Sequence, residues 1–210
     1  NRNDTAGTDV AMIAQGMIRR GLSAGEQGLE NTFRVASLGE GNNRLPGYPL
    51  ARLYFTGREL KAVLELLHVV AANDPSYYCF SSGMEIEYKP KGRFLSRIAT
   101  ISILENDSLF IPVDVSRKNK LLYSVTADSY MMEFLTVLKK KSFGLINVQP
   151  KLSDGTPVAD FAQALIDFDA AKPGIQEGKV WKSMLDYASS FTDTDGNNIP
   201  EIPDAYLRDR

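Results

Sequence analysis

The segment that decides the fold class is residues 50–72, LARLYFTGRELKAVLELLHVVAA. Its first six residues are mostly apolar and predict a strand over 50–55. Thr56 and Glu59 follow with the spacing of a capping box, in which the Thr hydroxyl accepts from the amide of residue 59 and the Glu side chain reaches back. Apolar residues at helical spacing come next, so we expect an amphipathic helix ending near Ala72. Its predicted buried stripe is Leu60, Val63, Leu64, Leu67 and Ala71.

Further strands and helices alternate on both sides of this segment. The patterns predict strands at 9–14, 84–88, 98–104, 121–127 and 145–148. They predict helices at 29–35, 130–138, 157–166 and 180–188. The strands at 98–104 and 121–127 are expected to form an antiparallel set with 84–88. This interleaving predicts an α/β (α+β) fold with a mixed sheet, as one domain over residues 1–210.

Composition excludes several classes of protein. The chain has 210 residues, of which 43% are hydrophobic, and its 24 basic and 26 acidic residues leave a formal net charge of −2. This apolar content is too high for disorder, and no stretch approaches the ~20 apolar residues of a membrane-spanning helix. The near-neutral charge argues against a nucleic-acid partner. We therefore expect a globular chain with no membrane span and no nucleic-acid ligand.

The scarcity of Cys and His limits the chemistry. Cys79 and His68 are the single members of their types, so neither an intrachain disulfide nor a Cys/His metal cluster can form. His68 falls on the border of the apolar stripe, which favours a boundary histidine with a local hydrogen bond over a catalytic one. No acid–base pair can be identified from sequence, and we expect no hydrolytic machinery in this chain.

Six fragments, in order, resemble motifs of the C-terminal domain of the 5′-nucleotidase family. The resemblance covers about residues 9–150, and residues 151–210 are predicted to be a helical extension and tail. The fragments are 11–19 (AMIAQGMIR, similar to a motif ending N-G-G-G-I-R), 23–26 (SAGE, similar to P-A-G-E), 31–39 (ending S-L-G, similar to L-P-F-G), 53–61 (LYFTGRELK), 80–88 (FSSGMEIEY) and 123–126 (YSVT).

The resemblance implies the non-catalytic half of a two-domain hydrolase. In the family, an N-terminal metallophosphoesterase domain holds two divalent metal ions, and the C-terminal domain grips the nucleoside end of the substrate between two aromatic rings. The implied partners of this chain are therefore a nucleoside or nucleotide and that N-terminal domain of the same polypeptide. Metal ions are expected only in the catalytic domain. Family habit also implies a secreted, periplasmic or cell-surface location.

Four residues are the substrate-binding candidates that the resemblance transfers. Arg19 matches the motif arginine that lies at the substrate, and Gly16 lies in the glycine turn before it. Leu38 stands where the family has its first stacking Phe, and Tyr130 stands near the second. No residue is expected to be catalytic.

Each candidate also has a structural interpretation. Arg19 can be a surface arginine in an ion pair, and Leu38 can be an aliphatic core residue. Tyr130 can be an interior helix residue, because it is four residues from Phe134. The motif asparagine is replaced by Ala14, and no G-G-D-G loop follows Tyr130, so the family's ribose-binding Asp has no counterpart. The alternative function is accordingly a structural or interface domain of the same parent protein that has lost its ligand.

One tail segment resembles a cation-binding loop. Asp193, Asp195 and Asn197 place side-chain oxygens at alternate positions, as calcium loops do. The later Gly and Glu of such loops are missing. The pattern favours an Asx-rich solvated loop over a calcium site.

Overall fold

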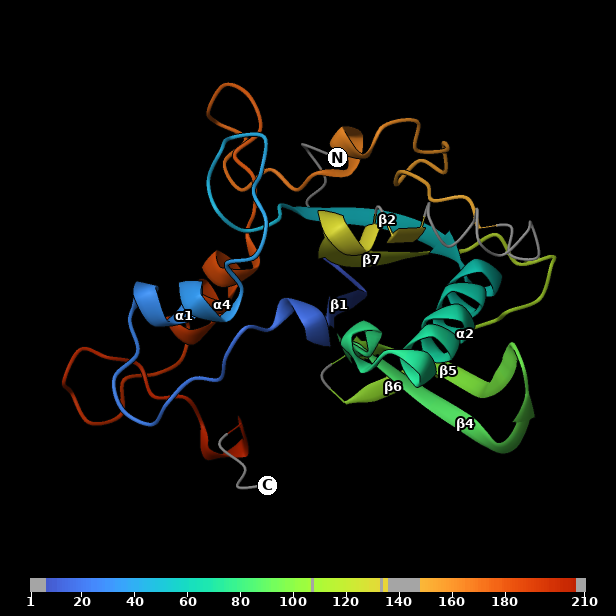
Figure 1. Ribbon diagram of the computed structural model, residues 1–210, viewed down its shortest axis with the longest axis horizontal. Helices are drawn as coiled ribbons and strands as arrows, with labels where there is room; N and C mark the ends of the chain where they lie inside the picture. The colour runs from blue at the N-terminus through green and yellow to red at the C-terminus, as the bar shows by residue number, and fades with distance from the viewer. Residues whose placement is uncertain (1–6, 107, 133, 136–147, 207–210) are drawn as a thin grey trace.

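The computed structural model describes residues 7–106, 108–132, 134–135 and 148–206, and it shows a mixed α/β architecture (Figure 1). Two β-sheets contribute to one buried apolar cluster together with helix α2 (Gly57–Asn73). A pair of short helices, α1 (Leu29–Val35) and α4 (Val180–Ala188), packs together on the other side of the molecule. The predicted fold class is confirmed.

The first sheet is mixed and has four strands. Its order is β2 (Leu50–Thr56), β7 (Leu122–Asp128), β1 (Val10–Ala14) and β3 (Cys79–Ser82). The β2–β7 and β1–β3 pairs are antiparallel, whereas β1 and β7 are parallel. This sheet lies next to α2. Because β1 and β7 are parallel and β3 is antiparallel to β1, the C-terminal ends of β1 and β7 lie at the same edge of the sheet as the start of β3.

The second sheet is an antiparallel meander of β4 (Met84–Arg93), β5 (Ser96–Asn106) and β6 (Leu109–Pro112). The predicted pairing of 84–88 with 98–104 is confirmed, but the predicted addition of 121–127 to this sheet is wrong. That strand is β7, and it lies between β2 and β1. The physical reason is burial: four of its last five residues are buried, so it needs an interior position rather than a sheet with one wet face.

Helix α2 begins as the capping box predicts. The Glu59 amide donates to Thr56 Oγ1 at 3.3 Å, and the Thr56 amide donates to Glu59 Oε2 at 2.9 Å. Leu60, Val63 and two further residues of the predicted stripe are buried in the core. The helix packs on β2, β5 and β7, so it joins the two sheets.

The predicted helix over 157–166 is wrong. Only a single 3₁₀ turn forms, η3 (Phe161–Ala164), and Asp160 caps it in place of Thr156. The flanking backbone is extended because it pairs with β2: the Ile166 amide donates to the Leu50 carbonyl at 2.9 Å. The predicted helices at 29–35 and 180–188 are confirmed as α1 and α4.

Residues 129–132 and 134–135 are helical, which confirms the start of the predicted helix at 130–138. The rest of that helix and most of the strand expected at 145–148 lie outside the described residues. Within the described part of the chain, no helix has both the length and the apolar character that a membrane crossing requires.

Candidate functional site

The predicted substrate residue Gly16 lies where two 3₁₀ turns meet. These turns are η1 (Gln15–Met17), directly after β1, and η2 (Pro75–Tyr77), directly before β3. The Gln15 amide donates to the Tyr78 carbonyl at 2.7 Å. A Cβ atom on Gly16 would lie 3.1 Å from the carbonyl oxygen of Ser76, so a larger residue would push the turns apart.

Arg19 follows η1 and links it to the end of α1. Its amide donates to the Val35 carbonyl at 2.8 Å, and its Nη1 donates to the Gly16 carbonyl at 3.1 Å. The side chain is exposed, and none of the described carboxylates forms an ion pair with it. The expected surface ion pair is thus not seen among these residues, and most of the guanidinium donors face solvent.

Leu38 lies just beyond α1, in a loop that folds back on itself. Its carbonyl accepts from the Tyr48 amide at 2.9 Å. Next to it, Gly39 has a φ of +81°, and a Cβ there would lie 2.4 Å from the Tyr48 ring. The ring therefore lies directly over the Gly39 backbone. Leu38 itself is 41% exposed, so the interpretation of it as a core residue is wrong.

Tyr130 stacks on Tyr48, with ring centroids 5.5 Å apart and an interplanar angle of 29°. Its side chain also lies close to that of Tyr77 in η2, and it remains 40% exposed. Partial burial, followed by the neighbouring Tyr77, raises the pKa of Tyr130 above its usual value. Tyr77 in turn stacks on Phe134 at 4.7 Å. We call Tyr48, Tyr77 and Tyr130 the tyrosine cluster.

Tyr130 is the one predicted substrate residue in the tyrosine cluster, and main-chain contacts link the other three to it. Leu38 reaches it through Tyr48, and Gly16 reaches it through η2, which ends in Tyr77. Arg19 is hydrogen bonded to Gly16. Chemically, the group offers aromatic faces, phenol hydroxyls and a guanidinium, which suit a planar ring and an anionic group.

Asp128, at the end of β7, was missed by sequence reasoning. Its side chain is fully buried, and Oδ1 accepts from the Met131 amide at 3.0 Å as the cap of the helix that carries Tyr130. Oδ2 has no partner among the described residues. Burial raises the pKa of Asp128 above its usual value. Its position just before the helical pattern that starts at Tyr130 is the signal that could have marked Asp128 as a cap, because Asp is among the residues preferred there.

Cys79 lies near this carboxyl group, in β3. Burial, with Asp128 as a second cause, raises the pKa of the Cys79 thiol to about 12. A thiol with so high a pKa stays protonated at neutral pH and is a poor nucleophile or metal ligand. His68 rests against the ring of Tyr88 at 5.0 Å and is half-buried, in agreement with its interpretation as a boundary residue.

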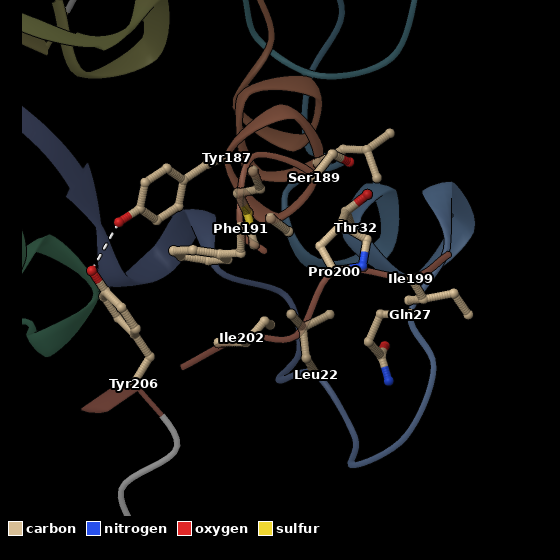
Figure 2. Close-up of a pocket in the computed structure, with 13 residues that line it drawn as sticks. Leu22, Gln27, Thr32, Tyr187, Ser189, Phe191, Ile199, Pro200, Ile202 and Tyr206 are labelled. Atoms are coloured by element: carbon tan, nitrogen blue, oxygen red, sulfur yellow. Dashed lines mark hydrogen bonds between the residues drawn. The ribbon is translucent and has the colours of Figure 1, made fainter. Parts of the chain in front are cut away.

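A separate pocket of about 220 Å³ lies between α1, α4 and the C-terminal segment (Figure 2). Its lining is largely apolar, and the hydroxyls of Tyr187 and Tyr206 are hydrogen bonded at 2.9 Å on one side. On the other side Gln27 presents a buried Oε1 atom that lacks a partner among the described residues. None of the four predicted substrate residues lines this pocket.

The candidate calcium loop is organised by its own hydrogen bonds. Asp193 accepts from the amides of Gly196 and Asn198, which lower the pKa of its carboxyl group. The carboxylates of Asp193 and Asp195 approach that of Glu201, with oxygens within 4.8 Å of one another. Asn197 donates to Asp195 from its side-chain amide at 3.1 Å, and its own side-chain oxygen accepts from the Ile199 amide at 2.7 Å, so that oxygen is already occupied. These contacts agree with a solvated Asx-rich loop.

Solved structures with a similar arrangement define the class of fold. The 5′-nucleotidase precursor from Thermus thermophilus superimposes with a TM-score of 0.51 at 18% identity, over 71% of this chain and 26% of its own. The NAD nucleotidase NadN from Haemophilus influenzae gives 0.50 at 15% identity, over 66% and 23%. At these identities the likeness shows the fold, an α/β domain that makes up about a quarter of each of these larger proteins.

Sequence comparison then assigns the family. Residues 2–138 match the family described as 5′-nucleotidase, C-terminal domain, and this match covers well over half of the chain. The chain therefore belongs to that family, as its motifs predicted. Among curated protein sequences, none matches it.

Proposed function

We propose that this chain is the nucleoside- or nucleotide-binding C-terminal domain of a 5′-nucleotidase-type, metal-dependent phosphoester hydrolase. In this proposal the chain binds the substrate. Hydrolysis is performed by an N-terminal metallophosphoesterase domain of the same polypeptide, outside residues 1–210. The location proposed with it is secreted, periplasmic or cell-surface. Family membership supports the parent class, and the tyrosine cluster supports the binding role.

The observation that carries the binding role is the position of Tyr130 relative to the other candidates. Its half-exposed ring is held by Tyr48 and Tyr77, so little conformational freedom is lost when a base stacks on it. Arg19 lies on the adjoining turn η1 with most of its donors in solvent. A guanidinium there suits a phosphate or ribose, because it offers a rigid fork of donors.

The residues of this chain do not fit a dinuclear metal centre built from Asp, His and Asn. Its single His, His68, is on helix α2 and lies against Tyr88 of β4. The described group with metal-like geometry is Asp193, Asp195 and Glu201, which contains carboxylates alone. No step of hydrolysis is therefore assigned to these residues, and the two divalent ions of the proposal belong to the other domain.

Titration of the isotope-labelled chain with adenosine, uridine and their monophosphates tests the proposal by NMR. We expect saturable shifts centred on Tyr48 and Tyr130, up to millimolar ligand concentrations. Tyr130→Ala should abolish them, while Tyr130→Phe should retain them because it keeps the aromatic face. Tyr187→Ala, in the separate pocket, is the matched control and should bind normally. Shifts that survive Tyr130→Ala would contradict the proposal.

The second candidate function is a structural or interface domain that no longer binds a ligand. A specific observation favours it: one face of Tyr130 is already occupied by Tyr48, and Leu38 offers no aromatic ring opposite. In that case the folded chain gives flat titrations with every nucleoside and nucleotide. The titration is then repeated with the catalytic domain attached. Binding in the longer protein would indicate a site that both domains must complete, and no binding would indicate a site that has been lost.

A further inference from the structure

The end of the hairpin formed by β4 and β5 carries a cluster of positively charged side chains on both sides of its turn. Lys89, Lys91, Arg93 and Arg97 all lie within nine residues, all are exposed, and no acidic residue interrupts them. None of the four forms an ion pair with any carboxylate that the structure describes. Because the whole chain has a net charge of −2, this concentration is local and produces a positive field at one end of the hairpin.

The turn at the apex of the same hairpin consists of apolar residues, whereas turns of this kind usually contain small or polar residues. Arg93 pairs with Ser96, which leaves Phe94 and Leu95 as a two-residue turn. Such turns favour Gly, Asn and Asp. Leu95 has a φ of +53°, a region that branched aliphatic residues disfavour, and packs back against the core. Phe94 is 71% exposed, so folding does not account for its presence.

The hairpin reaches the outer edge of the molecule. Figure 1 shows the outer ends of β4 and β5 on the opposite side from α1, α4 and the C-terminus. A tip only two residues wide is convex, so it suits a broad surface better than a ligand that needs enclosure. The combination is therefore one exposed aromatic ring at the apex with four exposed cations behind it.

We propose that residues 89–97 bind the surface of an anionic phospholipid membrane. Phe94 enters the interfacial region of the bilayer, where aromatic side chains are favoured, and the four cations contact lipid phosphates. Attachment by this hairpin would be peripheral and needs no membrane-spanning helix.

A nucleic acid is the less suitable anionic partner. Single-stranded nucleic acids are bound by a positive groove in which successive bases stack on several aromatic rings. The hairpin tip has one such ring on a convex surface. Tyr88, an exposed aromatic residue within β4, is packed beside His68. This proposal is independent of the nucleotide-binding role, because it uses none of the tyrosine cluster.

Flotation of the full 210-residue chain with vesicles provides the first test. We expect binding to a three-to-one mixture of phosphatidylcholine and phosphatidylglycerol, at least about tenfold stronger than to phosphatidylcholine alone, and weaker in high salt. The triple variant K89Q/K91Q/R93Q should lose roughly a hundredfold in partitioning. The charge-matched control R34Q/K172Q/K182Q removes three cations from exposed ion pairs elsewhere and should bind as the parent chain does.

A second pair of variants tests insertion of the ring. Phe94→Ser should weaken binding to the anionic vesicles about tenfold, because it removes the buried apolar surface. Phe94→Trp should bind, and its fluorescence should be quenched by lipids with brominated acyl chains beyond the background of Trp181 in the parent chain. Phe94 is exposed, so both variants are expected to fold, which circular dichroism checks.

Any one of three results would overturn the proposal. The first is an equal loss of binding in the charge-matched control, and the second is fluorescence of the Phe94→Trp variant that brominated lipids do not quench beyond the parent background. The third is hairpin-dependent binding to single-stranded DNA without binding to vesicles. That last result would identify a polyanion rather than a lipid surface as the partner.

Discussion

The ring of Tyr48 lies between two neighbours that the backbone holds in place, the Gly39 main chain and the ring of Tyr130. The loop that follows α1 is thereby fixed to the helix that follows β7. The contact explains how two candidate positions far apart in sequence, Leu38 and Tyr130, come to share one region. It also makes Tyr48 the central member of the tyrosine cluster.

Gly39→Ala should displace the Tyr48 ring. The new Cβ would lie 2.4 Å from that ring, at a φ of +81°, so both a clash and backbone strain result. We expect the free energy of unfolding to fall by about 2–4 kcal/mol. Gly174→Ala is the matched control, because Gly174 has a similar φ of +83° but open space around it, and should cost about 1 kcal/mol. Equal losses in urea unfolding would rule out the proposed packing.

Asp128→Asn should stabilise the protein at neutral pH. Burial raises the folded-state pKa of this carboxyl group, so the unfolded chain ionises first as the pH rises above 3.8, and stability declines until the folded pKa is passed. The amide still caps through its oxygen, and burying it costs less than burying a carboxylate. In thermal unfolding, the gain should grow as the pH rises above 3.8 and should level off once the folded-state pKa is passed. A variant less stable than the parent at pH 7 would contradict this.

Glu59→Gln should destabilise the protein by about 1–3 kcal/mol at pH 7. Burial opposes ionisation of Glu59, but hydrogen bonds from Lys151 and Thr56 together hold its pKa below 4.5. Lys151 Nζ lies 2.6 Å from both carboxylate oxygens. Stability from this group is therefore present above pH 4.5 and is lost as the pH falls through the lowered folded pKa. The pH profile of the variant should be flatter in that window.

The control for Glu59 is the exposed pair of Glu30 and Arg34, which are ion-paired along α1. Glu30→Gln should change the free energy of unfolding by less than about 0.5 kcal/mol, because solvent screens the pair. Comparable losses in the two variants would show that the partly buried position of Glu59 has no special effect.

Arg19→Ala should weaken binding of nucleoside monophosphates about tenfold in the NMR titration, with little change in stability. The side chain is exposed and makes one described hydrogen bond, to the Gly16 carbonyl. Arg20→Ala changes the same charge one position away and should leave affinity within about twofold. A loss of equal size in both variants would assign the effect to general electrostatics rather than to a specific contact of Arg19.

Local patterns in the sequence determined the elements whose causes are local. The Thr56–Glu59 spacing predicted the start of α2, because a capping box needs only residues three apart. The alternation of strand and helix patterns likewise predicted the fold class. The family motifs marked Leu38 and Tyr130, which both contact Tyr48 in the folded chain. What these motifs did not mark was Tyr48, because no short-range rule links it to Tyr130.

Only the tertiary structure decided which strands pair and which polar groups are buried. Strand β7 pairs with β1 in parallel, and Asp9, directly before β1, accepts from the Ser124 amide and hydroxyl across 115 positions of sequence. Pairing with β2 likewise holds the backbone at Ile166 extended, against a helical apolar pattern. Long-range hydrogen bonds and burial outweigh local propensity at such sites, so the place of β7, the single turn at Phe161–Ala164 and the buried carboxyl of Asp128 required the folded chain.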